Sequence, residues 1–138
     1  MFVLDTCVVS EFVKTVPNSG VLAWLKAQKE EDLLITTLTL GELLKGIERL
    51  PQGPKRSNLE AWFHFDLMIR FHNRIIAFDQ VASFEWGRLC ARLVMSGLPM
   101  PAVDSQIAAI CLSRAASLVT RNTSDFVASG VPIINPWS

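Results

Sequence analysis

The sequence predicts an α/β fold, a three-layer α/β/α sandwich with a central parallel sheet of four to five strands. Short apolar runs without alternating polar residues recur along the chain, and segments with helical periodicity separate them. Parallel sheets are covered by helices on both faces, so their strands are continuously apolar. The alternation of strand and helix also favours parallel strands, because the connection between two of them usually contains a helix.

Five apolar runs are expected to form the strands. The first, FVL, is followed at once by Asp5, and the others are also bounded by polar or turn-forming residues. Branched aliphatic side chains dominate these runs, as is typical of buried strands. The predicted strands are 2–4, 33–36, 75–78, 117–120 and 131–134.

Amphipathic segments between these runs are expected to form the helices. One of them places Leu40, Leu43 and Ile47 on a single stripe, which is the spacing of a buried helix face. Proline and glycine mark loops in PQGP (51–54) and GLPMP (97–101). The predicted helices are 8–14, 19–31, 38–50, 57–73, 80–96 and 102–115.

At 138 residues, the chain is expected to form one domain, spanning 1–138, with a single core. Its 13 basic residues balance its 13 acidic residues, so a polyanionic substrate would be attracted by local basic residues or metal ions. Half of the residues are hydrophobic, yet no apolar run approaches the roughly 20 residues of a membrane span. We therefore expect no membrane association and an apolar interface with another subunit or partner.

Three cysteines are present, Cys7, Cys90 and Cys111, and they form no C-x-x-C motif. An odd number without a motif argues against a disulfide framework and indicates a reducing compartment. No basic segment precedes the first apolar residues, which argues against a secretory signal. The predicted location is the cytoplasm.

Acidic residues fall where an α/β sheet forms its binding sites, beyond the carboxyl ends of the strands. Asp5 follows the first strand, and Asp125 lies in a polar loop, TRNTSD (120–125), after the fourth. Glu42 lies in the helix after the second strand, and Asp104 in the first turn of the helix before the fourth. We expect all four carboxylates to lie near the same edge of the sheet.

Each of these residues also has a structural explanation. Glu42 would complete a capping box with Thr39. Asp104 would complement the dipole of its helix, and Asp125 would be a solvated turn residue. Asp5 is the hardest to explain in this way, because a carboxylate at the end of an apolar strand is costly unless it is paired, solvated or bound to a cation.

A divalent cation would remove the repulsion among four carboxylates at one edge. Ligands that are all oxygen atoms suit Mg²⁺ or Mn²⁺, with water in the remaining positions. Such a site polarises a phosphoryl oxygen and generates hydroxide from bound water. Asp5 is therefore interpreted as a metal ligand.

Four segments of the chain resemble, in order, the motifs of the PIN domain family and of its VapC-type toxins from bacterial toxin–antitoxin pairs. The resemblance covers essentially the whole chain. The segments are FVLDTCVVSE, TTLTLGELLKGIERL, PAVDSQIAAICL, and LVTRNTSDF followed by VPIINPW.

The resemblance implies a metal-dependent ribonuclease that cuts single-stranded or loop RNA with metal-activated water and leaves a 5′-phosphate and a 3′-hydroxyl. It implies Mg²⁺ or Mn²⁺ as the cofactor, with Asp5, Glu42 and Asp104 as the core acids. The fourth acid is open between two positions, because this chain has Asn122 where some relatives carry an acid and Asp125 where others do. We favour Asp125.

The resemblance also suggests supporting residues and partners. Thr6 would hydrogen-bond near Asp5, Thr120 and Asn122 would orient water or carboxylates, and Arg121 would contact phosphate. A homodimer is implied, and so is a cognate antitoxin whose peptide runs along a groove towards the acidic site. An arginine of that peptide would displace or mimic the cation.

A different class of function stays open, a catalytically silent PIN-like module that acts only as the antitoxin's partner in autoregulation. The complete set of acids argues against it, since a silent module has no physical need for them. A phosphohydrolase with an aspartate nucleophile is disfavoured, because it would have Asp-x-Asp after the first strand, where this chain has Asp5, Thr6 and Cys7.

Overall fold

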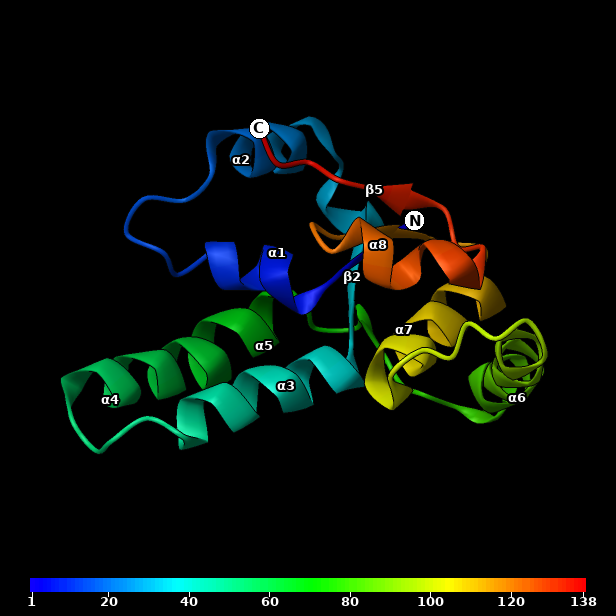
Figure 1. Cartoon of the computed structure of the whole chain (residues 1–138). Helices are drawn as coiled ribbons and strands as arrows, with labels where there is room; N and C mark the ends of the chain where they lie inside the picture. Colours follow the sequence, from blue (N-terminus) through cyan, green and yellow to red (C-terminus); the bar gives the residue numbers. More distant parts are fainter.

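The computed structural model describes residues 1–138 and contains a parallel sheet of five strands in the order β3-β2-β1-β4-β5 (Figure 1). The predicted fold class and all five predicted strands are confirmed, although the last three strands are shorter than expected. The two edge strands have one neighbour each, which limits how far their pairing extends. The strands are β1 (Phe2–Leu4), β2 (Leu33–Thr36), β3 (Ile75–Ile76), β4 (Ser117–Val119) and β5 (Ile133–Ile134).

The predicted helices all occur, and α2, α6 and α7 begin at the predicted residues, whereas other helix ends differ from the predicted ones by up to four residues. The predicted helix 57–73 contains a π-helical segment, η2, between α4 and α5. The predicted loop 120–125 was wrong in part, because its second half forms a short helix, α8, too short to give a periodic pattern. The helices are α1 (Thr6–Glu11), α2 (Ser19–Ala27), η1 (Glu30–Asp32), α3 (Thr37–Glu48), α4 (Pro54–Ala61), η2 (Trp62–Leu67), α5 (Met68–Arg70), α6 (Gln80–Met95), α7 (Ala102–Ser113), α8 (Thr123–Phe126) and η3 (Val127–Ser129).

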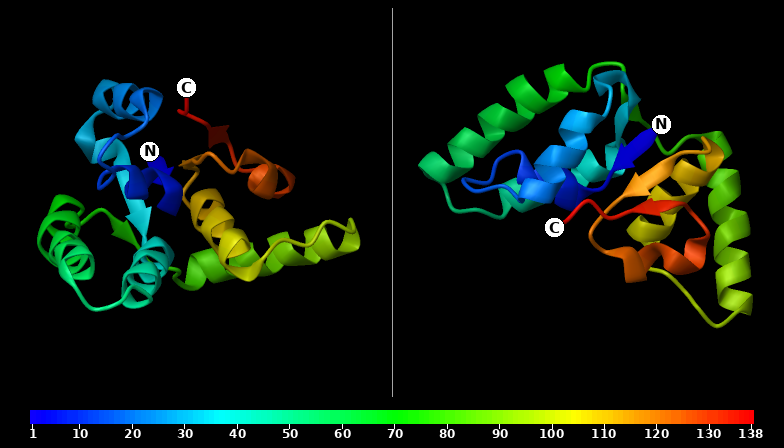
Figure 2. Two further views of the ribbon diagram at one scale, coloured as in Figure 1. Left: turned by 60° about the vertical axis from the view of Figure 1, so that its left-hand side comes forward. Right: turned by 90° about the horizontal axis from the view of Figure 1, so that it is seen from above.

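Helices from the first half of the chain cover one face of the sheet, and those from the second half cover the other (Figures 1 and 2). Successive side chains of a strand point to opposite faces of the sheet, and this alternation produces the division. Val3 and Leu118 point into the cluster formed with α6 and α7. Leu4 and Val119, one residue further along each strand, point into the cluster formed with α1, α3 and η2. The strands are thus buried on both sides, as their apolar sequences require.

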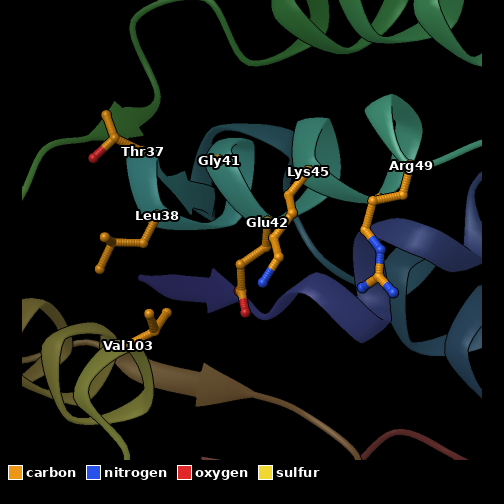
Figure 3. Close-up of a pocket in the computed structure, with 8 residues that line it drawn as sticks. Thr37, Leu38, Gly41, Glu42, Lys45, Arg49 and Val103 are labelled. Atoms are coloured by element: carbon orange, nitrogen blue, oxygen red, sulfur yellow. The ribbon is translucent and has the colours of Figure 1, made fainter.

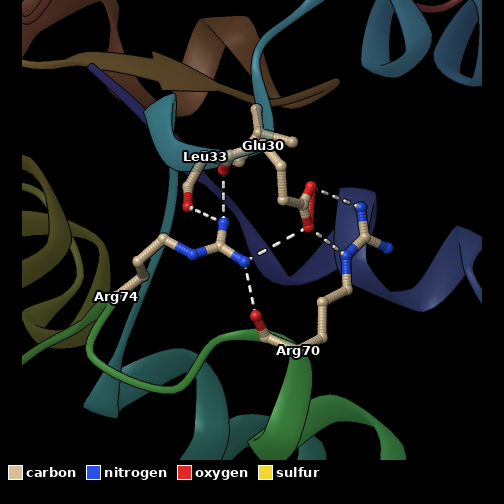
Figure 4. Close-up of polar contacts among 4 residues, drawn as sticks. All are labelled: Glu30, Leu33, Arg70 and Arg74. Atoms are coloured by element: carbon tan, nitrogen blue, oxygen red, sulfur yellow. Dashed lines mark hydrogen bonds and ion pairs between the residues drawn. The ribbon is translucent and has the colours of Figure 1, made fainter.

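A network of charged groups connects the amino end of β2 to the end of α5 (Figure 4). The guanidinium of Arg74 donates to the Leu33 carbonyl oxygen at 2.7 Å and to the carbonyl oxygens of Glu30 and Arg70. It also lies over the Phe71 ring, 4.8 Å from its centroid. The Glu30 carboxylate pairs with Arg70 at 2.7 Å and with Arg74 at 3.2 Å. These contacts hold η1 and the start of β2 against the segment that leads into β3.

None of the helices is long and apolar enough to span a membrane. The largest exposed apolar side chains on α6 are Val81, Phe84, Val94 and Met95, of which Met95 is 87% exposed. The surplus of apolar residues noted in the sequence is therefore partly on the surface of this helix.

Candidate active site

The order of the strands creates a crevice at the carboxyl ends of β1 and β4. The chain moves outward from β1 through β2 to β3, then returns to the other side of β1 with β4 and β5. The point where this direction reverses is the usual ligand site of open α/β sheets. Asp5 directly follows β1 and Thr120 directly follows β4, so the topology brings these two residues to the same crevice.

Asp5 is only 6% exposed, and the protein holds both of its carboxylate oxygens. Oδ1 accepts a hydrogen bond of 2.9 Å from the Thr6 backbone N–H, which makes Asp5 the N-cap of α1. Oδ2 accepts one of 2.8 Å from the Thr120 hydroxyl, and the Cys7 thiol lies 3.9 Å from it. Burial raises the pKa of Asp5, and the hydrogen bonds from Thr120, Thr6 and Cys7 oppose that increase. The result is a carboxylate in a fixed orientation.

Glu42 does not form the capping box predicted for it. Thr36 is the N-cap of α3, and its hydroxyl oxygen accepts a hydrogen bond of 3.1 Å from the Thr39 N–H. The helix therefore begins earlier than the Thr-x-x-Glu pattern suggested, and Glu42 lies more than one turn inside it. Its Oε1 accepts a hydrogen bond of 2.6 Å from the Thr6 hydroxyl. Thr6 thus connects the two acids, because its backbone N–H donates to Asp5 and its hydroxyl donates to Glu42.

Asp104 and Asp125 contribute two more carboxylates from the other half of the chain. Asp104 lies in the first turn of α7, and Asp125 lies in α8. The pKa of Asp104 is raised, first by partial burial and then by the negative charges of Asp5, Asp125 and Glu42. The charge of Asp125 also raises the pKa of Asp5. The charges of the other three acids therefore reach Asp104, although the four residues come from separate segments of the chain.

The remaining predicted site residues follow the end of β4. The Thr120 hydroxyl oxygen also accepts a hydrogen bond of 3.0 Å from the Asn122 backbone N–H. Asn122 therefore supports the site through its main chain. The guanidinium of Arg121 lies over the Trp137 ring, 5.0 Å from its centroid, and Arg121 is exposed to solvent.

The donor atoms fit a hard divalent cation, but the acids alone do not form a closed cage. All four predicted ligands are carboxylates, the ligand type that Mg²⁺ and Mn²⁺ prefer. No group of three or more His, Cys, Asp or Glu side chains is arranged closely enough to hold a metal ion. Mg²⁺ is commonly bound through one or two carboxylates and several waters. The mutual repulsion that raises the pKa of Asp104 is the feature that a bound cation would relieve.

Two hollows meet at Glu42. One, of about 510 Å³, lies between α3 and the start of α7, and Lys45, Arg49 and Val103 line part of it (Figure 3). The other, of about 220 Å³, has mostly apolar walls from α1, α3, α4 and η2. Sequence reasoning missed both hollows. The spacing of Glu42, Lys45 and Arg49 at i, i+3 and i+7 puts them on one helix face and was the available signal.

Replacement of Thr6 by valine is expected to lower any activity of this site roughly 10- to 100-fold, because misplacement of a reacting group by about 1 Å has effects of that size. Valine keeps the shape of the side chain and the backbone N–H that donates to Asp5, but it removes the hydroxyl that donates to Glu42. Thr6→Ser, which keeps the hydroxyl, is the control. If Glu42 is a ligand, Thr6→Val should also need more metal for half-maximal activity. Unchanged activity and metal dependence in Thr6→Val would mean that this hydrogen bond does not position the site.

Comparison with known proteins places the chain in a family. Residues 2–128 match the PIN domain. The chain is 37% identical over 137 residues to plasmid stability protein StbB of Pseudomonas syringae pv. tomato (99% of each chain), and 36% identical to VapC ribonuclease Y4jK of Sinorhizobium fredii (99% of this chain, 98% of the relative). It is 31% identical to toxin FitB of Neisseria gonorrhoeae, covering 99% of each chain.

Its structure is similar to a chain in the crystal structure of FitAcB from Neisseria gonorrhoeae, with a TM-score of 0.93, 31% identity and 99% coverage of both chains. Sequence and structure thus agree over nearly the full length. The fold, the order of the acidic segments and these relatives lead to one conclusion: the chain belongs to the PIN domain family, alongside VapC-type relatives.

Proposed function

We propose that the protein is a metal-dependent endoribonuclease, the toxin component of a type II toxin–antitoxin module, which hydrolyses RNA phosphodiester bonds. The observation that carries this proposal is the gathering of carboxylates at the carboxyl end of β1, where Thr6 joins Asp5 to Glu42 and the charges of Asp5, Glu42 and Asp125 act on Asp104. The names of two relatives, a VapC ribonuclease and toxin FitB, also support this proposal.

Asp5, Glu42, Asp104 and Asp125 would hold Mg²⁺ or Mn²⁺ together with coordinated water, since no three of these side chains are close enough to hold the ion by themselves. When bound, a cation of this kind supplies hydroxide from coordinated water and polarises a phosphoryl oxygen. The protein's own contribution is to fix the ligands. Thr120 and the Thr6 backbone hold Asp5, and the Thr6 hydroxyl holds Glu42.

Asp125 is preferred to Asn122 as the fourth acid. The charge of Asp125 acts on both Asp5 and Asp104, whereas Asn122 carries no charge and contacts the site through its backbone. Arg121 is assigned to a substrate phosphate, since it directly follows Thr120 in the chain and its exposed guanidinium can bind an anion bidentately.

Cleavage of total RNA by the purified chain tests the proposal. Discrete cuts are expected with Mg²⁺ or Mn²⁺ and none with EDTA. Asp5→Asn, purified in the same way, controls for contaminating nucleases; asparagine retains the N-cap of α1, so the fold should survive. If the antitoxin-free protein cuts no RNA with any metal, the nuclease assignment is wrong, and a catalytically silent antitoxin-binding module becomes the better description.

The antitoxin is assigned to the apolar groove of about 220 Å³ that ends at Thr6 and Glu42. Its walls include Leu43, Leu50 and Trp62, which suit apolar side chains of a peptide. The groove leads directly to the acids, so an arginine of the same peptide would be attracted to them. The solved structures similar to this chain include toxin–antitoxin complexes, among them FitAB bound to DNA (30% identity, TM-score 0.93).

Val13→Asp is expected to weaken binding of the cognate antitoxin at least about tenfold, because it puts a charge in an apolar groove. Val13 lines the groove and is 39% exposed, so the fold should tolerate the change. Val127→Asp, at a site outside the groove that is 69% exposed, is the matched control. Affinity measured by titration calorimetry that is the same for both variants and the wild type would exclude this groove.

A homodimer and a cytoplasmic location stay predictions. The exposed Phe84, Val94 and Met95 on α6 support a self-association surface. Light scattering of the purified chain tests the dimer, and a monomeric mass at high concentration would contradict it.

A further inference from the structure

The larger groove on α3 is basic, and its cations have no partners in the protein. Lys45 and Arg49 line this groove of about 510 Å³, which also includes Glu42 of the acidic site. Neither Lys45 nor Arg49 takes part in any of the six ion pairs of the structure. Arg56, Arg70 and Arg74, by contrast, are each held by carboxylates.

The two acidic residues of α3 nearest to these cations, Glu42 and Glu48, make their close contacts with other groups. Glu42 accepts a hydrogen bond from the Thr6 hydroxyl at 2.6 Å. Glu48, the neighbour of Arg49, pairs with Arg56 instead. Lys45 and Arg49 therefore place two positive charges that form no ion pair beside the acidic centre, where an anionic ligand can reach both.

The geometry of α3 relates these cations to the site. The side chains of Glu42, Lys45 and Arg49 project from one face of the helix into the same space, and Val103 of α7 faces them (Figure 3). With a rise of about 1.5 Å per residue, Lys45 and Arg49 lie roughly 6 Å apart along the helix. This separation is similar to that of successive phosphates in an extended strand.

The floor of the groove leaves room for a polymer. Gly41 and Gly46 line it, and a Cβ added to either would meet no other atom within 4 Å. Glycine is unfavourable inside a helix compared with alanine, so helix stability does not account for this pair. Their effect here is that a ligand can approach the backbone of α3.

We propose that Lys45 and Arg49 form a subsite for the RNA backbone, in which they bind phosphates that flank the bond cut at the acidic site. This inference rests on the proposed nuclease function. Only two of the eight lining residues are hydrophobic, compared with six of ten in the groove assigned to the antitoxin. The two hollows therefore suit different ligands, a polyanion and an apolar peptide, and they should be separable by mutation.

The test uses the full chain with Lys45→Ala and Arg49→Ala combined. The matched control is Lys29→Ala with Arg114→Ala, which removes the same two charges. Lys29 and Arg114 are exposed, belong to no ion pair and precede β2 and β4, so they lie at the opposite edge of the sheet. Melting temperatures of both double variants check that the fold is intact, since basic residues near the end of α3 also interact with its dipole.

For the groove variant, the KM for a single-stranded RNA is expected to rise about tenfold with little change in kcat. The slope of log affinity against log salt, measured by fluorescence anisotropy in EDTA, should become shallower by about 1.4, which is about 0.7 for each of two phosphate contacts. The control should match the wild type in both measurements. Gly41→Leu, which fills the groove without altering charge, should also weaken RNA binding.

Three results would overturn the proposal, and they are distinguishable. If the wild type cuts RNA but the groove variant has the same KM and salt slope, the subsite is wrong and the nuclease stands. If the groove variant loses affinity for the cognate antitoxin and not for RNA, the groove binds protein. If the wild type neither cuts nor binds RNA, the nuclease function and the subsite fail together.

Discussion

Asp104→Asn is expected to lower RNA cleavage at least about 100-fold and, in the absence of metal, to make the protein more stable. Loss of a metal-ligating carboxylate accounts for the first effect. The second follows because Asp104 is repelled by Asp5, Asp125 and Glu42, and asparagine removes that repulsion. Since Asp104 is partly exposed, solvent screens the interaction and the gain in the free energy of unfolding should not exceed about 1 kcal/mol.

The pH dependence of stability has a defined sign. The pKa of Asp104 is raised in the folded state by burial and by its acidic neighbours. The folded state therefore binds more protons than the unfolded state, and stability falls as the pH rises from the ordinary carboxyl range through the raised pKa. Acidification through this window should stabilise the metal-free wild type more than Asp104→Asn.

A divalent cation should stabilise the wild type more than Asp104→Asn. At a concentration of about 100 times its Kd, it should stabilise the wild type by about 2.7 kcal/mol. The variant, which has lost a ligand, should gain less. Thermal unfolding with and without Mn²⁺, at several pH values, measures all of these changes.

Asp79→Asn is the matched control for Asp104→Asn. Asp79 is an exposed carboxylate that caps α6, and its side chain accepts from the Ala82 N–H at 2.9 Å. Asparagine is an equally good N-cap, so this variant should keep the activity and the metal response of the wild type. Undiminished cleavage by Asp104→Asn would exclude Asp104 from the metal site.

Arg74→Met is expected to lower the free energy of unfolding by about 2–4 kcal/mol and the melting temperature by roughly 10 °C. The guanidinium of Arg74 donates to the main-chain oxygens of Glu30, Leu33 and Arg70. Methionine has a similar length but no donor, so it leaves these carbonyl groups without this partner. The start of β2 would then be held less firmly against the segment before β3. Urea denaturation measures the change.

Two further variants make the result specific. Arg74→Lys keeps the charge but has a single compact ammonium, which cannot reach all of these acceptors at once, so it should recover less than half of the loss. Arg88→Met removes a 69% exposed arginine that pairs with Glu85 at 3.3 Å and should cost less than about 1 kcal/mol. Equal losses in Arg74→Met and Arg88→Met would mean that the network in Figure 4 does not contribute specifically to stability.

The fold and the convergence of the acids could be predicted from the sequence because their signals are local. A run such as FVL needs cover on both faces wherever it lies, and this requirement leads to a parallel sheet between layers of helices. In such a sheet Asp5 and the segment after β4 must meet at one edge. The shared motifs of the PIN domain family pointed to the same acids.

The tertiary structure decided which partner each acid has. Thr36 and Thr39 are both residues that can serve as the N-cap of α3. Because β2 ends at Thr36, the helix begins directly after it, and Thr36 is the N-cap. Glu42 is therefore free of the capping box, and it binds the hydroxyl of Thr6, which is 36 residues away in the sequence.

The sequence by itself thus determined the layered fold and the chemical type of the site, because apolar patterning and residue identity act along the chain. Only the tertiary structure decided that Thr6 joins two of the acids and that Lys45 and Arg49 line a groove beside α7 and form no ion pair. Those features depend on contacts between distant segments, and no local pattern encodes the separation of two side chains that meet only after the sheet has formed.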